Sequence, residues 1–521
     1  MANFEASPPA AFKVLFFLAC FCYLYLHVFA FPTTPIYYEA DHVKMIHEAS
    51  RMAGGEMIYK DFWEFIFPGS ISFFALLISL FGPKYWLISG VIILHGMITA
   101  YLGVVIARRV ISDTLVAYLP SAIYIFFGFR WFGIDAEHRM LSPIFLSIAL
   151  ILLLRSRSYK MVGLAGAVCA LASFFTQPRG LLALAAIGVF LLIELGIRER
   201  NWKRLATSWL VLTAAFFLTL AALLAPYVYP VGITRFVDDT IFFISSYSQD
   251  PYTNSWRTYF STIIKLKAAG TTMLVVTVFY SLLIPAVYLV TLAILWLKRK
   301  TWHRDRVAPI LLTTLIGLFL VLGTTGPNAM RLYQISLPAL IVLVWLIWQT
   351  RLLKSVWAGA AIGLLMVAGL ALAIRTQAAW DTVTLDTASG RIVFLSKVIS
   401  ERYEWLLERS RPQDKVFEVY ICHVNFPLGL RNPSRMSILL NTGYSPPHHV
   451  AWALEDLKRD MPRFIIWDGA WTKEMPQMED EERLKPIYLF LTKYYRPVQA
   501  FTPYDGRERE AWELISADSG R

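Results

Sequence analysis

Apolar stretches of about 20 residues recur along most of this chain, and they limit its fold more than any other feature, because a helix needs about that length to cross a bilayer. Only 17% of the 521 residues are charged, which is low for a soluble protein of this size. We predict eleven membrane-spanning helices, at about residues 11–30, 86–107, 113–129, 140–154, 161–176, 180–197, 206–226, 271–297, 307–325, 332–350 and 355–374. The sequence therefore predicts a polytopic α-helical membrane protein.

The loops between these spans alternate in charge. Lysine and arginine gather after the second, fourth, sixth, eighth and tenth spans, as in Arg108-Arg109 and in 298–306. Cytoplasmic loops carry such an excess, so we expect a cytoplasmic N-terminus and an extracytoplasmic C-terminus. The same loops account for the net charge of +12, and we therefore expect membrane lipids, and no nucleic acid, as partners.

This topology leaves a long first outer loop, residues 31–85. The loop contains a polar helix that ends at Gly54-Gly55 and then the apolar stretch SISFFALLISLF (70–81). The stretch is too short to cross a bilayer and follows Pro68-Gly69, so we predict a helix that lies on the membrane surface. A second outer loop is predicted at about 227–270.

The composition changes after the last span. Residues 1–379 form the membrane module, whereas residues 380–521 are charged and rich in proline. The stretch RIVFLSKVISERYEWLLE has a helical period, and KVFEVYI and RFIIWDG resemble short strands. We therefore predict a small C-terminal α/β domain on the outer, extracytoplasmic face.

Polar side chains gather at the predicted outer ends of the spans. They come from the first loop and from three further outer turns: Asp41, Asp61, Glu64, Asp135, Glu137, His138, Arg139, Gln177, Arg179, Arg331 and Tyr333. Charges near lipid are costly, so such a set is typical of a functional cavity. Transporters place their key charges near the bilayer midplane, whereas these crowd one face, which favours an enzyme over the alternative of a lipid or solute transporter.

Carboxylates and arginines together are suited to one kind of chemistry at a membrane surface. A carboxylate can take the proton of an incoming hydroxyl group, and an arginine can bind and neutralise a phosphate leaving group. The set therefore favours the transfer of a sugar from a lipid-linked phosphate carrier, whose long isoprenoid tail requires a site built into a membrane.

The same residues also have purely structural interpretations. Asp41 precedes HVKMIHEASRMAGG as an N-cap residue would, with Gly54 as the C-cap, although Lys44 at the third helical position leaves a capping box incomplete. In this interpretation, Asp135 and Glu137 are solvated turn residues.

Structural interpretations also apply to the basic residues. Arg331 would be an anchor that reaches lipid head groups. We expect His42, His47 and His138 to be hydrogen-bonding surface histidines rather than metal ligands.

The first loop, taken with the arrangement of the spans, resembles the GT-C superfamily of integral-membrane glycosyltransferases. In that family an acidic residue opens a juxtamembrane helix with spaced small residues, and the counterparts here are Asp41 and Ala49. A Gly-x-x-x-Tyr stretch and a Pro-containing interfacial helix follow in the family, and GEMIYKDFWEF, which contains Tyr59, and Pro68-Gly69 match them here.

The resemblance leaves some assignments open. Many members have an Asp-Glu pair where this chain has Asp41-His42, so Asp61 or Glu64 would supply the further carboxylate of the first loop. A second family acid, at the outer end of the third span, falls on DAEH, as either Asp135 or Glu137. FFTQPRG and MRLYQISLPAL resemble later family motifs, and they contain Arg179, Arg331 and Tyr333.

The resemblance implies an inverting glycosyltransferase of a bacterial-type plasma membrane, with its active site on the outer face. The donor would be a polyprenyl-phosphate-linked sugar, and the acceptor stays open between protein, lipid and polysaccharide. Asp41 would be the general base and Arg331 would hold the donor phosphate together with Arg179. His138, Tyr333 and Tyr59 are further substrate-binding candidates.

Two further points stay open at this stage. Asp135 or Glu137 would position the acceptor or a cation, and no cofactor is required, although a divalent metal ion is compatible with these carboxylates. The alternative enzyme is an oligosaccharide polymerase or ligase that uses diphosphate-linked glycans.

Overall fold

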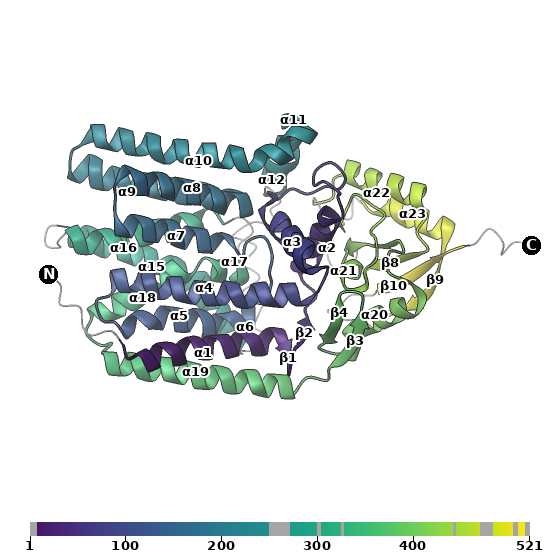
Figure 1. Cartoon of the computed structure of the whole chain (residues 1–521), viewed down its shortest axis with the longest axis horizontal. Coiled ribbons are helices and arrows are strands. Elements are labelled where there is room, and N and C mark those ends of the chain that lie inside the picture. The colour runs from purple at the N-terminus through teal and green to yellow at the C-terminus, as the bar shows by residue number, and fades with distance from the viewer. Residues whose placement is uncertain are drawn as a thin grey trace, which may run out of the picture.

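The computed structural model describes residues 8–248, 271–299, 304–324, 328–440, 444–468, 483–503 and 509–515. The helices of the first three quarters of the chain lie side by side in a bundle, and the C-terminal region packs against one end of it (Figure 1). The first loop lies between the bundle and the C-terminal region. The outer ends predicted from loop charge therefore all lie at the same end of the bundle.

An apolar helix is found at each of the eleven predicted spans. They are α1 (Ala10–Val28), α4 (Trp86–Val110), the segment Val116–Phe132, which contains α5 (Leu119–Ala122) and α6 (Phe129–Phe132), α7 (Ser142–Arg155), α8 (Tyr159–Phe175), α9 (Gln177–Leu191), α10 (Trp202–Val231), α14 (Thr271–Val278) followed by α15 (Ile284–Leu297), α16 (Arg304–Leu322), α18 (Leu337–Gln349) and α19 (Ser355–Ala378). Six of these segments are long and apolar enough to cross a membrane by length and composition alone. The chain is a multi-pass membrane protein.

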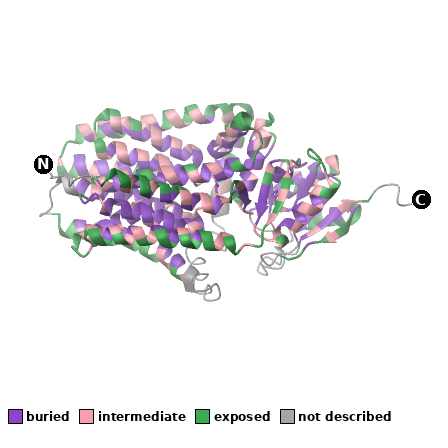
Figure 2. Cartoon of the chain, turned by 60° about the horizontal axis from the view of Figure 1, so that its bottom comes forward, coloured by how far each residue is buried: buried purple, intermediate pink, exposed green. Residues whose placement is uncertain are grey.

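The outer helices of the bundle expose apolar side chains. In α10 and α19 only 22% and 28% of the most apolar windows are buried, and Leu218 and Val367 are 72% and 69% exposed. Figure 2 shows buried residues inside the bundle and exposed residues along its outer helices. Such a surface is stable only if lipid covers it.

The tenth predicted span, 332–350, is not one continuous helix. A short helix, α17 (Ala329–Gln334), ends before α18 begins at Leu337. Pro338 has no N–H group to bond the carbonyl of Gln334 four residues earlier, so the hydrogen-bond ladder is interrupted. The break separates α17, which carries Arg331, from the helix that follows.

The second predicted outer loop, 227–270, is helical over much of its described part. Helix α10 continues to Val231, and α11 (Ile233–Val237) and α12 (Phe243–Ser248) follow. The turn is at Gly232, whose φ of 82° favours glycine. Residues 249–270 of this predicted loop lie outside the described part of the chain.

The first loop contains the two predicted helices, α2 (Asp41–Ala53) and α3 (Gly69–Phe81). Thirteen helical residues extend about 20 Å, which is too short for a hydrocarbon core of about 30 Å. A Cβ atom at Gly69 would lie 2.5 Å from the carbonyl oxygen of Phe174, so only glycine allows α3 to approach the end of α8 this closely. The position of α3 on the membrane surface stays a prediction.

The C-terminal region is a mixed α/β structure, as predicted. One sheet has the order β5-β8-β10-β9, with β5 parallel to β8 and the other pairs antiparallel. The strands of this sheet are β5 (Val416–Glu418), β8 (Phe464–Asp468), β9 (Tyr495–Ala500) and β10 (Arg509–Leu514). The helices of the region are α20 (Lys397–Arg409), α21 (Asn425–Leu428), α22 (Pro447–Asp460) and α23 (Lys485–Tyr494). A separate short pair is formed by β6 (Tyr420–Ile421) and β7 (Ile438–Leu439). The predicted helical stretch from Arg391 begins as strand, because β4 occupies Gly390–Phe394.

A second sheet joins the C-terminal region to the first loop. Its order is β1-β2-β4-β3. Strand β1 (Phe29–Ala30) directly follows α1 and β2 (Thr34–Tyr37) lies in the first loop, whereas β3 (Val383–Thr387) and β4 belong to the C-terminal region. Strand β2 runs parallel to β4 and pairs Ile36 with Val393. The segment before α2 is thus fixed to the C-terminal region by main-chain hydrogen bonds.

The predicted topology can be tested at two exposed positions at opposite ends of the bundle. We expect Thr384→Cys, in β3, to react with a membrane-impermeant maleimide in intact cells, and Ser158→Cys, between α7 and α8, to react only after permeabilisation. Both side chains are exposed, so access depends on the membrane alone. Labelling of Ser158→Cys alone in intact cells would reverse the proposed orientation.

Candidate active site

A cavity of about 220 Å³, here called the junction cavity, lies where the first loop, the outer turns and the C-terminal region meet. It is lined by Asp41, Lys44, Met45, Glu64, Phe65, Ile66, Glu137, His138, Arg139, Arg331, Tyr420, Ile421, Ile438, Leu440 and Tyr444. Six segments of the sequence thus supply its walls: 41–45, 64–66, 137–139, 331, 420–421 and 438–444. Five of the predicted site residues line the cavity: Asp41, Glu64, Glu137, His138 and Arg331.

Asp41 is not the N-cap of α2. The N-cap residue is Ala40, Asp41 is the first residue of the helix, and its carboxylate accepts no hydrogen bond from the described residues. The capping interpretation of Asp41 is therefore wrong, although Gly54 does end the helix as predicted. The Asp41 side chain is exposed to the space of the cavity. The surrounding protein and the nearby Asp135 and Glu137 carboxylates raise the pKa of Asp41 to about 6.

Three carboxylates come together at one wall of the junction cavity. One oxygen atom from each of Asp41, Asp135 and Glu137 lies within 4.8 Å of the others. Oxygen ligands from several carboxylates are the set that Mg²⁺, Mn²⁺ and Ca²⁺ prefer. The residues present are therefore compatible with a divalent cation.

Neighbouring side chains fix two members of this trio, Asp135 and Glu137. Asp135 accepts a hydrogen bond from Nδ1 of His42 at 2.8 Å, and Glu137 binds Arg139 and accepts from Nε2 of Gln334 at 2.9 Å. His42 is 1% exposed, so the expectation of a surface histidine is wrong for it. The bond from Gln334 connects the turn after the third span to α17, which also carries Arg331.

Lys44 is a residue that the sequence interpretation treated only as a missing capping residue. Its Nζ atom lies 3.1 Å from a carboxylate oxygen of Glu48 and also bonds Glu64. Burial opposes the charge on Lys44, but Glu48 and Glu64 outweigh this effect and hold its pKa well above the usual value. Lys44 therefore places a permanent positive charge at the cavity, about one helical turn from Asp41.

The structure separates the two alternative carboxylates of the first loop. Glu64 is buried, lines the junction cavity and bonds Lys44. Asp61 is exposed, accepts a hydrogen bond from the backbone N–H of Met57 at 2.8 Å and lines a different cavity. Geometry therefore favours Glu64 over Asp61 as the further first-loop carboxylate of the site.

Three predicted substrate-binding residues do not line the junction cavity. Arg179 is buried and donates to Ser142 and Gln334, both at 3.0 Å. Tyr333 is stacked on another tyrosine inside the bundle, and the Tyr59 hydroxyl donates to the backbone oxygen of Ile66 at 2.6 Å. All three side chains are used within the fold, and direct substrate contact by them stays a prediction.

The cavity also contains three basic side chains, two of which bond its carboxylates: Arg139 bonds Glu137 and Lys44 bonds Glu64. Lys44, Arg139 and Arg331 line the cavity, and Arg331 is half-buried. The surrounding protein and the positive charge of Arg139 hold the pKa of His138 well below its usual value, so its imidazole is neutral at physiological pH. The site therefore pairs a carboxylate wall with cations suited to an anionic ligand.

The C-terminal region completes the cavity with side chains that the sequence interpretation missed. Tyr420 and Tyr444 line it, with apolar residues of β6 and β7. Tyr420 has a φ of 97°, which is rare for a large side chain and occurs mostly where function or strong packing requires it. The sequence gives no sign of the position of these tyrosines, because aromatic residues are common in α/β domains.

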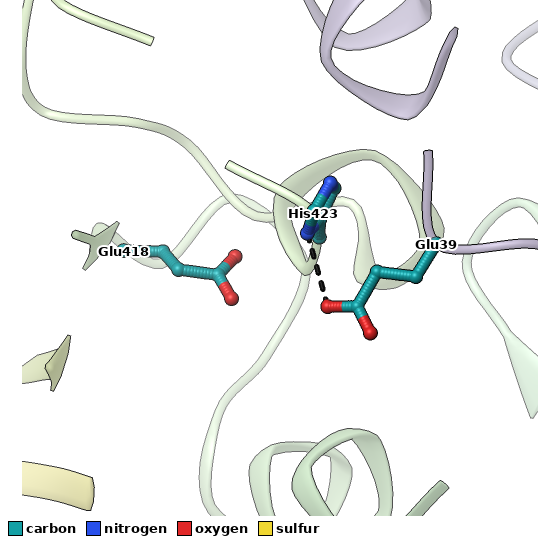
Figure 3. A group of neighbouring side chains, drawn as sticks. All are labelled: Glu39, Glu418 and His423. Atoms are coloured by element: carbon teal, nitrogen blue, oxygen red, sulfur yellow. Dashed lines mark hydrogen bonds and ion pairs between the residues drawn. The ribbon is translucent and has the colours of Figure 1, made fainter. Parts of the chain in front are cut away.

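A buried ion cluster fixes the segment that leads into Asp41. Figure 3 shows Glu39, Glu418 and His423 facing one another, with the His423 ring bonded to Glu39 at 3.0 Å. One ligand atom of each lies within 4.8 Å of the others. However, Arg402 already lies 2.6 Å from Glu39 and 3.4 Å from Glu418, and its charge compensates the carboxylates. We therefore interpret the cluster as a structural clasp rather than a metal site.

The ion cluster makes a testable contribution to stability. Burial opposes ionisation of Glu39, but Arg402 and His423 together hold its pKa well below the usual range. Arg402→Met removes the nearest cation from these buried carboxylates and leaves Arg509, which lies 3.8 Å from Glu39, so we expect the free energy of unfolding to fall by about 3 kcal/mol. Denaturant unfolding in detergent, followed by tryptophan fluorescence, measures it.

Arg409→Met is the matched control for this prediction, because Arg409 pairs with Glu408 on the exposed face of the same helix. We expect the control to change the free energy by less than about 1 kcal/mol. Equal effects of the two substitutions would contradict the clasp.

No family model and no curated protein match the sequence. Among solved structures, the chain is similar to ArnT from Cupriavidus metallidurans, which was crystallised bound to undecaprenyl phosphate. The TM-score is 0.57 at 11% sequence identity, and the alignment covers 97% of this chain and 98% of ArnT. The chain thus shares the fold of ArnT over nearly its whole length. This confirms the predicted fold class, a polytopic α-helical membrane protein with a small C-terminal α/β region.

Proposed function

We propose that the protein is an inverting glycosyltransferase that moves a sugar from a polyprenyl-phosphate donor to an acceptor on the outer face of the plasma membrane. The observation that carries this proposal is the junction cavity at one end of an apolar bundle. Arg331 lines it, and so does Asp41, whose carboxylate has no hydrogen-bond partner among the described residues. The fold shared with ArnT, which was crystallised with a polyprenyl phosphate, supports a lipid-linked donor.

Asp41 has the properties of a general base. Its side chain is exposed to the cavity, and its raised pKa of about 6 makes it a better proton acceptor than an ordinary aspartate while it stays ionised at neutral pH. In the reaction, Asp41 takes the proton of an acceptor hydroxyl group as that oxygen forms a bond to the anomeric carbon. The opposite bond, to the phosphate oxygen, breaks, and configuration is inverted.

The positively charged side chains of the cavity stabilise the negative charge that develops on the leaving group. As the sugar–oxygen bond breaks, its electron pair passes to the polyprenyl phosphate. Arg331 can bind that phosphate through its planar fork, and Arg139 and Lys44 add positive charge to the same cavity. The apolar bundle beside the cavity suits the isoprenoid tail.

A divalent cation at Asp41, Asp135 and Glu137 would serve the same end. Bound there, it would supply positive charge for the donor phosphate. Asp41 would then be one of the ligands of the cation. Glu64 is not a member of the trio and bonds Lys44 instead.

Substitution of Asp41 tests the proposal directly. Asp41→Asn keeps the size of the side chain but cannot accept a proton at neutral pH, so we expect single-turnover transfer to fall at least about a hundredfold. Because Asp41 makes no capping bond, stability should change little. Transfer is measured with donor extracted from the native membranes, and native mass spectrometry of the purified protein should detect a bound polyprenyl-phosphate sugar that accumulates in the Asp41→Asn variant.

Asp41→Glu is the matched control, because it keeps the carboxylate and should retain part of the activity. Near-normal transfer by Asp41→Asn would remove Asp41 from the role of base. Absence of any isoprenoid phosphate from both proteins would contradict the donor class.

The raised pKa of Asp41 also predicts a pH dependence of transfer. The base acts only when deprotonated, so the rate should rise with pH through about 6 and be about tenfold lower at pH 5 than at pH 8. The residual rate of Asp41→Asn should not show this rise. A wild-type rate that is flat between pH 5 and 8 would contradict the assignment.

A further inference from the structure

A second and larger cavity, of about 970 Å³, lies between the first loop and the C-terminal region. We call it the outer groove. Its walls are the second half of α2, the turn at 56–61, the end of α3, α21 with the segment 429–435 that follows it, and the end of α22. The junction cavity shares none of its lining residues.

Helix α2 separates the two cavities. Asp41, Lys44 and Met45 face the junction cavity, whereas His47 and Arg51 line the outer groove. With 3.6 residues per turn, these two sets lie on different faces of the same helix. A ligand in the groove would therefore lie beside the catalytic centre and not in it.

Two buried polar atoms beside the groove have no partner among the described residues. They are Nε2 of His47 and Oδ1 of Asn425, in side chains that are 3% and 0% exposed and that both line the groove. The other amide atom of Asn425 donates to the backbone oxygen of Val416 at 3.0 Å, which fixes its orientation. A buried polar atom left unpaired costs about 1–3 kcal/mol, so such atoms favour a site that a polar ligand completes.

His47 is a neutral hydrogen-bonding group in this position. Burial and the nearby charge of Arg51 lower its pKa to about 3, so the expectation of a surface histidine is wrong here too. A neutral imidazole offers one donor and one acceptor. Hydroxyl groups match both, as they match the amide oxygen of Asn425.

The charges at the groove favour an anionic ligand. Six lysine and arginine side chains line it, against four carboxylates. Most of them are paired with each other, as in Arg435 with Asp456 at 2.9 Å. Lys60, in contrast, forms no ion pair with described residues, and the Arg431 guanidinium bonds only the neutral amide of Gln413. Both side chains are exposed at the rim.

We propose that the outer groove binds an anionic, hydroxyl-rich segment of the acceptor glycan, remote from the hydroxyl group that reacts. The inference rests on the proposed glycosyl transfer, because the ligand of the groove is the acceptor of that reaction. The acceptor would extend from the junction cavity around the end of α2 into the groove. Helix α2 is about 20 Å long, so the acceptor is an oligosaccharide of several units that carries carboxylate or phosphate groups. Its charges meet Lys60 and Arg431, and its hydroxyl groups meet His47 and Asn425.

Calorimetry on the full chain in nanodiscs of zwitterionic lipid tests this proposal. The acidic probes are hexagalacturonate, with carboxylates, and pentamannosyl phosphate, with a phosphate, and maltohexaose is the neutral probe. We expect at least one acidic probe to bind, with an affinity that falls as salt rises, and the neutral probe to bind much more weakly. Failure of both acidic probes to bind, or equal binding of maltohexaose, would overturn the proposal.

Paired variants locate the binding. The double variant Lys60→Ala/Arg431→Ala should weaken binding of the acidic probe at least about tenfold, because it removes two charge-assisted contacts. The control Arg463→Ala/Lys493→Ala removes two exposed cations of the C-terminal region that do not line the groove, and binding should be unchanged. Equal binding of the acidic probe by the two double variants would exclude the groove as its binding site.

One further variant separates this inference from the proposed function. Asp41→Asn should bind the acidic probe as the wild type does, since Asp41 does not line the groove. Normal transfer by Asp41→Asn would contradict the proposed base and leave the groove intact. If the wild type binds neither acidic probe while its transfer activity still depends on Asp41, the groove proposal alone is contradicted.

Discussion

Compensation of buried charge is the constraint on which the outer end of this molecule depends. A carboxylate taken out of water costs several kcal/mol unless a cation or hydrogen-bond donors face it. Each buried carboxylate near the junction cavity has such a partner: Glu64 has Lys44, Glu137 has Arg139, and Glu39 has Arg402. Asp41 stands apart, because it is near other carboxylates and faces open space. The pairs hold the segments in place, whereas Asp41 has no such partner among the described residues, which agrees with its proposed role as base.

These pairs also explain why the site needs the whole chain. The hydrogen bond between Glu137 and Gln334 joins residues 197 positions apart, and the bond between His423 and Glu39 joins residues 384 apart. Strand β2 adds main-chain bonds to β4. The C-terminal region is therefore part of the framework that presents Asp41, and two of its tyrosines close the cavity.

The sequence predicted most of the fold because hydropathy and loop charge are local signals. The eleven apolar segments, α2, α3 and the α/β character of the C-terminal region were all read from short windows. The break before Pro338 and the strand at Gly390–Phe394 were missed, since a continuous apolar or periodic pattern hides them. For the site, the residue types were found, but not their neighbours: the roles of Lys44 and Tyr420, and the inward positions of Arg179 and Tyr333, depend on contacts across long sequence distances.

Helix α2 is a wall shared by two cavities, and this arrangement has a thermodynamic consequence. Any ligand that prefers one position of the helix changes the affinity of the other cavity, and the factor is the same in both directions. Helix α2 is held at its start by the clasp and by the sheet that contains β2, and in its second half Arg51 pairs with Glu56 and bonds the backbone oxygen of Ser434. A ligand that shifted α2 in this way would couple the two cavities through the thirteen residues of that helix alone.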